Sequence, residues 1–323
     1  MRNGLMRNRL MPDGLITNNL VSNNLGFPAV RRLEADDLKS CAALAVDRGW
    51  WPERGKWSLL LASSDAFGID APDGQGLAGT VILTRWGADC GGIGMMLIAS
   101  RYGGQGLGRA LMEHVLRAAE DLAAVSLFAT GAGRPLYDKL GFKPVRRSVA
   151  FRGHFRADPQ INNSKRRSER AGADSLEGSS GNVRVATEAD LPAILTLDRA
   201  AYGADRTRIL TRLPAFAERM VVLEASEGIV GYAAAWRNTP ASTVIGPLVA
   251  LDGETARRLV TALAAGARTP VRLDLDPDRA ELPGWAHAHG LEPAGHTVVM
   301  AHGDVTGRGT QGRLFTPISV ALA

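Results

Sequence analysis

The stretch Gly103-Gly104-Gln105-Gly106-Leu107-Gly108-Arg109-Ala110-Leu111 decides the fold class of this 323-residue chain. It follows the apolar run 95–98, which has the composition of a buried strand, and it opens a segment with an apolar stripe at helical spacing. A strand, a glycine-rich turn and a helix N-terminus in this order present unpaired N–H groups and the positive end of the helix dipole. Glycine lets a bulky anion approach such a backbone closely. The stretch therefore predicts an α/β fold whose turn binds a phosphate or pyrophosphate.

The spacing of these glycines excludes two common nucleotide-binding motifs. A P-loop requires Gly-Lys followed by Ser or Thr, which the stretch lacks. A dinucleotide-binding turn requires G-x-G-x-x-G, whereas this stretch has G-x-G-x-G and lies late in its block. A different phosphate-bearing ligand is therefore expected.

The stretch resembles the acyl-CoA pyrophosphate loop of the GNAT N-acetyltransferase superfamily, whose pattern is Arg/Gln-x-x-Gly-x-Gly-x-Ala/Gly with a leucine soon after. Gly106, Gly108 and Ala110 match this pattern. Gly103 stands where the family has Arg or Gln, and Arg101 is two positions out of register. Because backbone N–H groups make most of such a cradle, this departure implies weaker rather than abolished CoA binding.

The resemblance implies acetyl-CoA as co-substrate and no metal. It also implies that strands 93–98 and 124–129 splay apart to take the pantetheine arm, with a backbone N–H stabilising the oxyanion. The residues expected to contact acetyl-CoA are Met96, Leu97, Ile98, Gly103, Gly104, Gln105, Gly106, Leu107, Gly108 and Arg109.

A second landmark is Gly133-Arg134-Pro135-Leu136-Tyr137-Asp138-Lys139-Leu140-Gly141-Phe142. It resembles the closing helix-turn of the same family, in which a tyrosine lies four residues before Gly-Phe. The resemblance implies that Tyr137 is the general acid that protonates the leaving thiolate; a tyrosine that only packs is the alternative. Pairing a thiol pKa of about 8.5 with a phenol pKa of about 10 makes this proton transfer mildly uphill.

The sequence does not identify the general base that takes a proton from the amine. Asp89, just before the central strand, and Glu53, beside Trp50 and Trp51, are the carboxylate candidates, with solvated surface acids as the alternative. The two tryptophans either line the acceptor pocket or belong to the core.

Three further residues receive no chemical role. His287 and His289 have no third ligand at a zinc-binding spacing, so a metal site is not expected there. Cys90 has no evident base partner, which argues against covalent catalysis.

Two blocks of the chain repeat one another, which indicates a tandem duplication. Short matches occur in the same order at a nearly constant offset. They are Val30-Arg31 with Val183-Arg184, Leu77-Ala78-Gly79-Thr80-Val81 with Ile229-Val230-Gly231-Tyr232-Ala233, and Gly141-Phe142-Lys143-Pro144 with Gly290-Leu291-Glu292-Pro293. The chain therefore resembles bacterial tandem-GNAT proteins.

The second copy lacks both landmarks. The run Leu251-Asp252-Gly253-Glu254-Thr255-Ala256 falls opposite the glycine loop, and Ala286 falls at the position of the tyrosine. Because the two acids would repel a pyrophosphate, this copy is expected to be degenerate and non-catalytic.

The expected fold class is α/β, with two tandem GNAT-like domains, each a mixed, mostly antiparallel central sheet flanked by helices. The expected organisation is a disordered leader at 1–27, a catalytic domain at 28–153, a flexible linker at 154–182 and a degenerate domain at 183–323. The leader and the linker are polar or lack a consistent apolar face, so they cannot offset the entropy of ordering.

The composition is that of a globular protein, with 45% hydrophobic and 22% charged residues. No apolar run approaches the roughly 20 residues of a membrane span, no signal-peptide pattern is present, and two cysteines suit a reducing compartment. A cytoplasmic protein without membrane attachment is therefore expected. The net charge of +5 comes from arginines distributed along the chain, so nucleic acid is not an expected partner.

The predicted function is an acetyl-CoA-dependent N-acetyltransferase acting on a small-molecule amine, with a homodimer left open. The alternatives are a non-enzymatic CoA-sensing or partner-binding protein, and an acyltransferase that uses a longer acyl group or a hydroxyl acceptor. The second half is expected to form a wall of the acceptor pocket, so that a chain cut after about residue 153 stays soluble and binds acetyl-CoA. If the second half only stabilises the first, the cut chain should aggregate.

Overall fold

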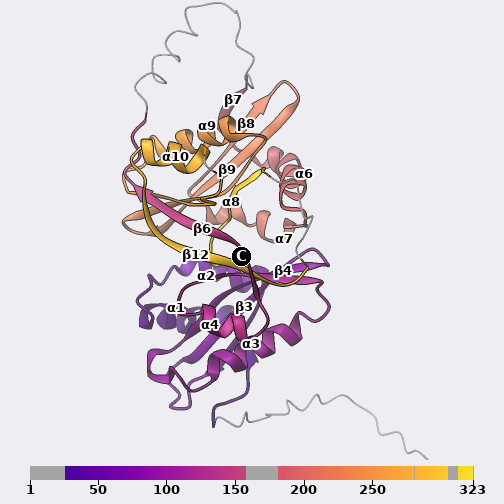
Figure 1. Ribbon diagram of the computed structural model, residues 1–323, viewed down its shortest axis with the longest axis vertical. Helices are drawn as coiled ribbons and strands as arrows, with labels where there is room; N and C mark the ends of the chain where they lie inside the picture. The colour runs from indigo at the N-terminus through magenta and orange to yellow at the C-terminus, as the bar shows by residue number, and fades with distance from the viewer. Residues whose placement is uncertain (1–25, 158–180, 280, 305–311, 323) are drawn as a thin grey trace, which may run out of the picture.

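The computed structural model describes residues 26–157, 181–279, 281–304 and 312–322. The two halves of the chain lie at opposite ends of an elongated molecule, and the end of the chain returns to its middle (Figure 1). Most of the leader expected at 1–27 and of the linker expected at 154–182 lies outside the described residues.

The first half contains the elements that its apolar patterns predict around the glycine loop. Helix α3 (Leu107–Ala118) begins after Gly106 and buries Leu107, Leu111, Met112 and Val115. The other elements are β1 (Arg31–Arg32), η1 (Ala35–Asp37), α1 (Leu38–Asp47), α2 (Arg54–Ser63), β2 (Asp65–Asp70), β3 (Leu77–Trp86), β4 (Cys90–Ile98), η2 (Ser100–Tyr102), β5 (Ala124–Ala129), α4 (Arg134–Lys139) and β6 (Lys143–Gly153).

The second half repeats this order with small differences in the helices. Its elements are β7 (Asn182–Val185), η3 (Glu188–Asp190), α6 (Leu191–Tyr202), α7 (Thr207–Leu210), α8 (Leu213–Phe216), β8 (Arg219–Ala225), β9 (Gly228–Thr239), β10 (Ser242–Ala250), α9 (Gly253–Ala264), β11 (Val271–Leu275), α10 (Glu281–Ala288), β12 (Glu292–Gly303) and β13 (Leu314–Thr316).

The same ion pair opens each half, as expected of a duplication. Arg31 donates to Asp37 at 2.7 Å, and Arg184 donates to Asp190 at 2.7 Å. Each aspartate also accepts a backbone N–H from three residues earlier, which closes a capping box in front of the first long helix. These bonds fix the chain between the first strand and the first helix in both copies.

The strands of both halves form one continuous sheet in the order β1-β2-β3-β4-β5-β12-β6-β11-β10-β9-β8-β7, with β13 pairing β10. Neighbouring strands are antiparallel except for β4 with β5 and β10 with β11. The expected α/β class, with a mixed and mostly antiparallel sheet flanked by helices, is therefore confirmed.

The two halves exchange their last long strands, which the sequence analysis did not anticipate. Strand β12 of the second half pairs β5 of the first, and β6 of the first half pairs β11 of the second. Met300 of β12 is fully buried in the core beneath α3, and Phe151 of β6 is buried in the core beneath α9. The two blocks that are separate in sequence are therefore joined through their cores.

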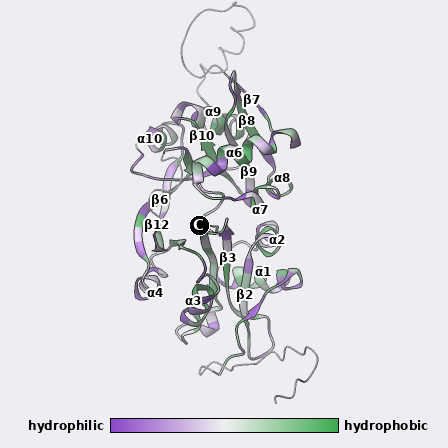
Figure 2. Ribbon diagram, turned by 90° about the vertical axis from the view of Figure 1, so that its right-hand side faces the viewer, coloured by the Kyte–Doolittle hydropathy of each residue, from purple (hydrophilic) through white to green (hydrophobic). Residues whose placement is uncertain are grey.

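A further core lies between the halves and belongs to both. It contains Trp57 and Trp86 from the first half, Leu213 and Tyr232 from the second, and Ile318 from the end of the chain. Figure 2 shows the hydrophobic residues gathered on the strands of the sheet in both halves. The relative position of the halves is thus set by packing as well as by strand pairing.

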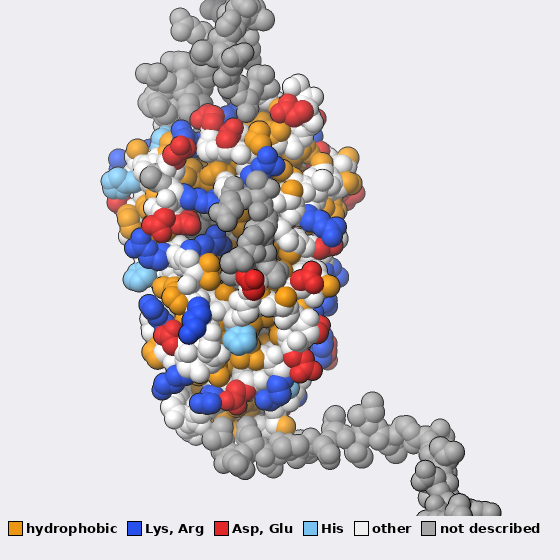
Figure 3. Space-filling view, turned by 45° about the vertical axis from the view of Figure 1, so that its right-hand side comes forward, with side chains coloured by type: hydrophobic (Ala, Val, Ile, Leu, Met, Phe, Trp, Pro, Cys, Tyr) orange, Lys and Arg blue, Asp and Glu red, His pale blue; other side chains and the backbone are white. Residues whose placement is uncertain are grey.

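In the part of the chain that the structure describes, no helix is long and apolar enough to cross a membrane. On the face shown in Figure 3, basic and acidic side chains are interspersed. The absence of a nucleic-acid partner stays a prediction.

Candidate active site

The two central strands of the first half separate at a bulge in β4. Parallel pairing of β4 and β5 runs as far as Ile93, and against β3 the register shifts so that Met95 and Met96 both lie opposite one residue. Met95 has φ of 48°, and the Thr80 hydroxyl donates to its carbonyl at 2.9 Å. A bulge of this kind bends a strand away from its neighbour. The splay predicted from the sequence is therefore present.

The glycine loop leads from this splay to the N-terminus of α3. Gly104 and Gly106 have φ of 76° and 83°, a conformation that other residues adopt at a cost, and Gly106 is the N-cap of α3. A Cβ at Gly104 would meet no atom within 4 Å, whereas a Cβ at Gly108 would lie 2.9 Å from Met96 Cε. The loop is thus open on its outer side and packed against β4 on its inner side, as an anion cradle requires.

The residues expected to contact acetyl-CoA lie in β4, in the loop after η2 and in the first turn of α3, with Leu97 and Leu107 buried. Their role in binding stays a prediction. Two arginines near this surface have other partners. Arg109 contacts Glu113 at 2.7 Å. Arg101 donates to the Gln75 carbonyl at 2.9 Å and lies 3.4 Å from Asp73. Arg101 is therefore held toward the β2–β3 turn and does not replace the arginine or glutamine that the family places at Gly103.

Tyr137 lies on α4, next to the splay, and is 8% exposed. Burial raises the pKa of its phenol to about 12. Because of this raised pKa, proton transfer from the Tyr137 phenol to a thiolate is less favourable than transfer from an exposed tyrosine. The same apolar surroundings disfavour a thiolate and so increase its affinity for the proton.

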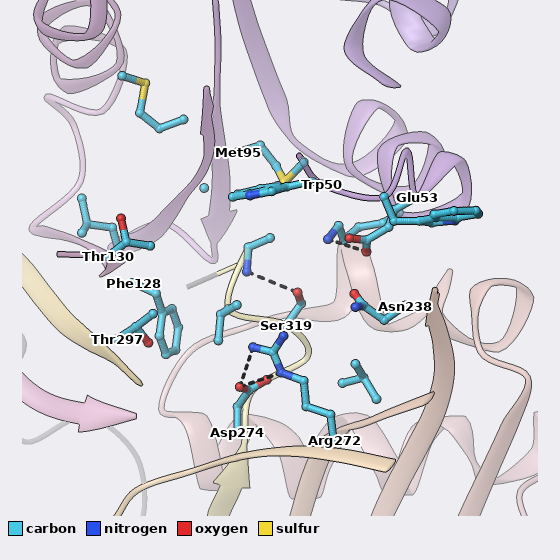
Figure 4. A pocket seen from close by; sticks show the side chains of 18 of the residues that line it. Trp50, Glu53, Met95, Phe128, Thr130, Asn238, Arg272, Asp274, Thr297 and Ser319 are labelled. Carbon is cyan, nitrogen blue, oxygen red and sulfur yellow. Dashed lines mark hydrogen bonds and ion pairs between the residues drawn. The ribbon is translucent and has the colours of Figure 1, made fainter. Parts of the chain in front are cut away.

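A cavity of about 330 Å³ lies between the halves and contains the end of the splay. The first half contributes Met95 and Tyr137 to its lining, and the second half contributes Trp236 and Arg272. Figure 4 shows the charged and polar groups of both halves directed into this space.

The cavity resolves two alternatives that the sequence left open. Trp50, Trp51 and Glu53 all line it, so the tryptophans face the candidate acceptor space rather than the core. Asp89 is exposed in the β3–β4 turn, where its carbonyl accepts from the backbone N–H of Ala124 at 3.2 Å, and it does not line the cavity. Of the two named carboxylates, Glu53 is therefore the one that lines the cavity.

Glu53 is held by a partner from each half. Lys56 Nζ lies 2.5 Å from Glu53 Oε2, and both side chains are at most 10% exposed. The amide of Asn238 is assigned with its nitrogen toward the carboxylate, the reverse of the orientation drawn in Figure 4, because its oxygen would otherwise face only acceptors. So assigned, it donates to Oε2 at 3.1 Å and to Oε1 at 3.3 Å. Burial lowers the pKa of Lys56, and the charge of Glu53 opposes this shift. Glu53 itself is in a left-handed conformation, with φ of 37°, at the start of α2.

A second ion pair lies on β11, across the cavity from Trp50 in Figure 4. Arg272 donates to Asp274 Oδ1 from Nε at 3.1 Å and from Nη2 at 2.8 Å. Burial raises the pKa of Asp274, and the adjacent guanidinium partly offsets this shift.

The end of the chain forms a third wall of the cavity through Ser319, Val320 and Ala321. The Ala321 carbonyl oxygen lies so close to Gly94 that a Cβ there would be 1.8 Å from it. Trp236 Nε1 donates to the Ile318 carbonyl at 3.2 Å and fixes the segment from the other side. Glycine at position 94 is therefore required for this segment to reach the splay.

In the second half, the chain itself fills the equivalent groove. Pairing of β10 with β11 extends over Thr243 and Val244, and beyond it β13 pairs β10 through Leu248. The N-terminus of α9 is also closed, because Asp252 accepts from the backbone N–H of Thr255 at 2.8 Å. These features agree with the expected loss of a cradle in this copy.

The residues that received no chemical role have structural partners. His287 contacts Glu292 at 3.0 Å, and His289 Nδ1 lies 2.8 Å from the Trp285 carbonyl. Cys90 is buried and donates to the Trp86 carbonyl at 3.4 Å.

Sequence reasoning missed most of the polar residues of the cavity, among them Lys56, Asn238, Arg272 and Asp274. A signal existed for the last two, because Arg272 and Asp274 interrupt an otherwise apolar strand at alternate positions and so share one of its faces. Lys56 and Asn238 have no comparable signal in the sequence.

Both halves match known acetyltransferases in sequence. Residues 30–142 match the model described as Acetyltransferase (GNAT) family, and residues 194–316 match the model described as Acetyltransferase (GNAT) domain. The two matches lie in separate halves and together span most of the chain. The chain therefore belongs to the GNAT acetyltransferases, of the tandem type with two GNAT domains.

Particular relatives agree with this assignment. An uncharacterized N-acetyltransferase of Bacillus subtilis (strain 168), YitH, is 26% identical over 237 residues, which are 72% of this chain and 77% of that protein. A proposed acetyltransferase from Pyrococcus horikoshii has a similar structure, with a TM-score of 0.73 and 17% identity over 98% of this chain and 100% of that one. A tandem GNAT protein from the clavulanic acid biosynthesis pathway has a TM-score of 0.58 and 15% identity, covering 84% and 97%. The likeness to the two solved structures is one of fold.

Proposed function

We propose that this protein is an N-acetyltransferase that moves an acetyl group from acetyl-CoA to the amine of a small molecule. One observation carries the proposal: a single cavity joins the splay of β4, Tyr137 and Glu53 to a polar wall from the second half. Sites formed between domains are common places for small ligands. The second half, on this proposal, forms the far wall of the acceptor site.

The glycine loop fits the co-substrate by its geometry, because the loop is open outward and leads directly into the N-terminus of α3. Bound acetyl-CoA supplies a thioester: the amine adds to its carbonyl carbon, and the resulting oxyanion adduct then expels the CoA thiolate. The N–H groups of the loop and of the first turn of α3 would bind the pyrophosphate. The backbone of β4 at Met95 and Met96, beyond the last pair with β5, would stabilise the oxyanion.

Two side chains then move protons. Glu53 is the carboxylate that we assign to accept the proton of the incoming ammonium, and Lys56 and Asn238 hold it in place. Tyr137 donates its phenolic proton to the departing sulfur, and the phenolate is reprotonated by the second proton that the nitrogen loses as the amide forms. Because the phenol stays protonated below its pKa of about 12, it remains an acid over the whole working range of pH.

The replacement Tyr137→Phe is expected to lower kcat on a good amine roughly 100-fold, since a general acid is lost, with little change in acetyl-CoA affinity. Tyr202→Phe is the matched control, because burial raises the pKa of Tyr202 to about 12 as well, yet this residue lies outside the cavity. Thiol release during steady-state turnover measures both. An unchanged kcat in Tyr137→Phe from pH 6 to 10 would remove this residue from the mechanism.

A further inference from the structure

We propose that the acceptor is an amine that also carries a carboxylate, and that Arg272 of β11 binds this carboxylate. The inference rests on the proposed function for the position of the amine, and it names the chemical class of the acceptor. It assigns to the second half a binding role in addition to that of a wall.

The first observation is that Arg272, rather than Asp274, is the member of the pair that faces the cavity. The side chain of Arg272 is 27% exposed, whereas that of Asp274 is 6% exposed. Asp274 accepts from Nε and Nη2 of the guanidinium, and no described residue accepts from Nη1. A molecule that enters the cavity therefore meets the guanidinium, with the carboxylate behind it.

The second observation is which donors around the cavity still lack an acceptor. The Glu53 carboxylate accepts from Lys56 and from the amide of Asn238, and a carboxylate has further lone pairs for the proton of the amine. Lys56 uses one of its three N–H groups on Glu53, and Arg272 has N–H groups beyond the two that bind Asp274. The two cations and two carboxylates of the lining balance in charge, but Nη1 of Arg272 has no acceptor among the described residues. An anionic oxygen of a ligand would supply that acceptor.

The third observation is that the remaining lining is uncharged. Trp50, Met95, Phe128 and Trp236 contribute apolar surface, and the polar side chains beside them are hydroxyls such as those of Thr297 and Ser319. Among the described residues, Asp274 is therefore the one charged partner of the guanidinium. A planar carboxylate matches its fork of N–H groups better than a neutral oxygen does. A tetrahedral phosphonate shares this chemistry and is the alternative that the experiment must separate.

The fourth observation concerns the orientation that a molecule bound at Arg272 would have in the cavity. In Figure 4, Arg272 and Asp274 lie on one side of the cavity, and Trp50 and Met95 lie on the opposite side, where the bulge of β4 is. A molecule anchored at Arg272 by its carboxylate would extend its amine across the cavity toward the splay. An amino acid has this arrangement of groups.

The experiment compares acceptors in matched sets, with CoA present so that no turnover occurs. The twenty protein amino acids, β-alanine and γ-aminobutyrate are each titrated calorimetrically beside the corresponding amine that lacks the carboxylate. For phenylalanine the set also includes 1-amino-2-phenylethylphosphonate. At least one amino acid is expected to bind about 10- to 100-fold more tightly than its decarboxylated amine, as a charged hydrogen-bonded pair allows. If the phosphonate binds more tightly than phenylalanine, the carboxylate proposal is wrong, and Arg272 instead binds a phosphonate or phosphate group.

Variants of the pair test whether Arg272 causes the preference. Arg272→Gln should remove the preference for the carboxylate, while binding of the decarboxylated amine changes less than about threefold. Because Arg272→Gln leaves Asp274 buried without its partner, the double variant Arg272→Gln/Asp274→Asn is made as well. Arg147→Gln is the matched control, since Arg147 pairs with Asp278 at 2.9 Å in an exposed position outside the cavity.

The outcomes separate this inference from the proposed function. If amines without a carboxylate bind as well as every amino acid, or if Arg272→Gln weakens both to the same degree, the inference is wrong. If amino acids bind through Arg272 but acetyl-CoA releases no thiol with them, the inference holds and the proposed acetyl transfer fails. If amines are acetylated equally well with and without a carboxylate, the proposed function holds and the inference is wrong.

Discussion

Replacing Gly106 by glutamate is expected to reduce acetyl-CoA affinity by more than about 100-fold, to the point where calorimetry detects no binding. Gly106 has φ of 83° at the N-cap of α3, where a side chain adds about 1–3 kcal/mol of backbone strain. The added carboxylate would also lie where the loop and the helix dipole favour the pyrophosphate, and like charges repel at that position.

Two control variants separate these causes. Gly106→Ala introduces the strain without the charge and should weaken binding less. Gly228→Glu introduces both at a β8–β9 turn with φ of 113°, in the other half of the molecule, and should leave acetyl-CoA affinity unchanged. Wild-type protein should bind a single acetyl-CoA per chain. Wild-type affinity in Gly106→Glu would show that the cradle lies elsewhere.

A chain cut after residue 157 is expected to be insoluble and unable to bind acetyl-CoA. Without the second half, β5 loses its partner β12, and Met300 no longer fills the core under α3. Strand β6 at the same time loses both of its neighbours, β12 and β11. Such uncovered strand edges and apolar surface promote aggregation. The strand exchange therefore favours the second of the two outcomes that the sequence left open.

Co-expression of the two pieces tests the cause of this failure. Fragments 1–165 and 166–323 produced together should form one complex that binds acetyl-CoA, because each supplies the strand that the other lacks. Size-exclusion chromatography and calorimetry on the same sample measure assembly and binding. A soluble fragment 1–157 with wild-type affinity for acetyl-CoA would show that β12 is dispensable to the first half.

Much of the first half could be predicted from its sequence, because the informative features are local. The glycine loop, the apolar stripe of α3 and the position of Tyr137 depend on residues within a few turns of one another. The loss of the second cradle was also predictable, since Asp252 and Glu254 stand where the first half has its glycine loop. Asp252 is in addition the N-cap of α9.

The strand exchange could not be predicted, and the duplication itself is the reason. Strands β6 and β12 follow matching turns, Gly141-Phe142-Lys143-Pro144 and Gly290-Leu291-Glu292-Pro293, and they meet equivalent edges at β5 and β11. Periodicity states which face of a strand is buried but not which of two similar edges it joins. The polar wall of the cavity was missed for the same reason, because Arg272 and Tyr137 share a cavity only through the arrangement of the halves.

The exchange of β6 and β12 makes the chain the covalent equivalent of a strand-swapped dimer. Its pseudo-twofold axis lies between β12 and β6, which are neighbours in the middle of the sheet. In a symmetric dimer every substitution occurs twice, so one site cannot lose its cradle while the other keeps it. Joining the copies removes that constraint. One copy can then close its helix with Asp252 and lay β13 in its own groove, while its β11 still serves the cavity of the other. Joining the two copies in one chain thus allows one copy to keep the cradle while the other specialises in lining the cavity, which two identical subunits could not do.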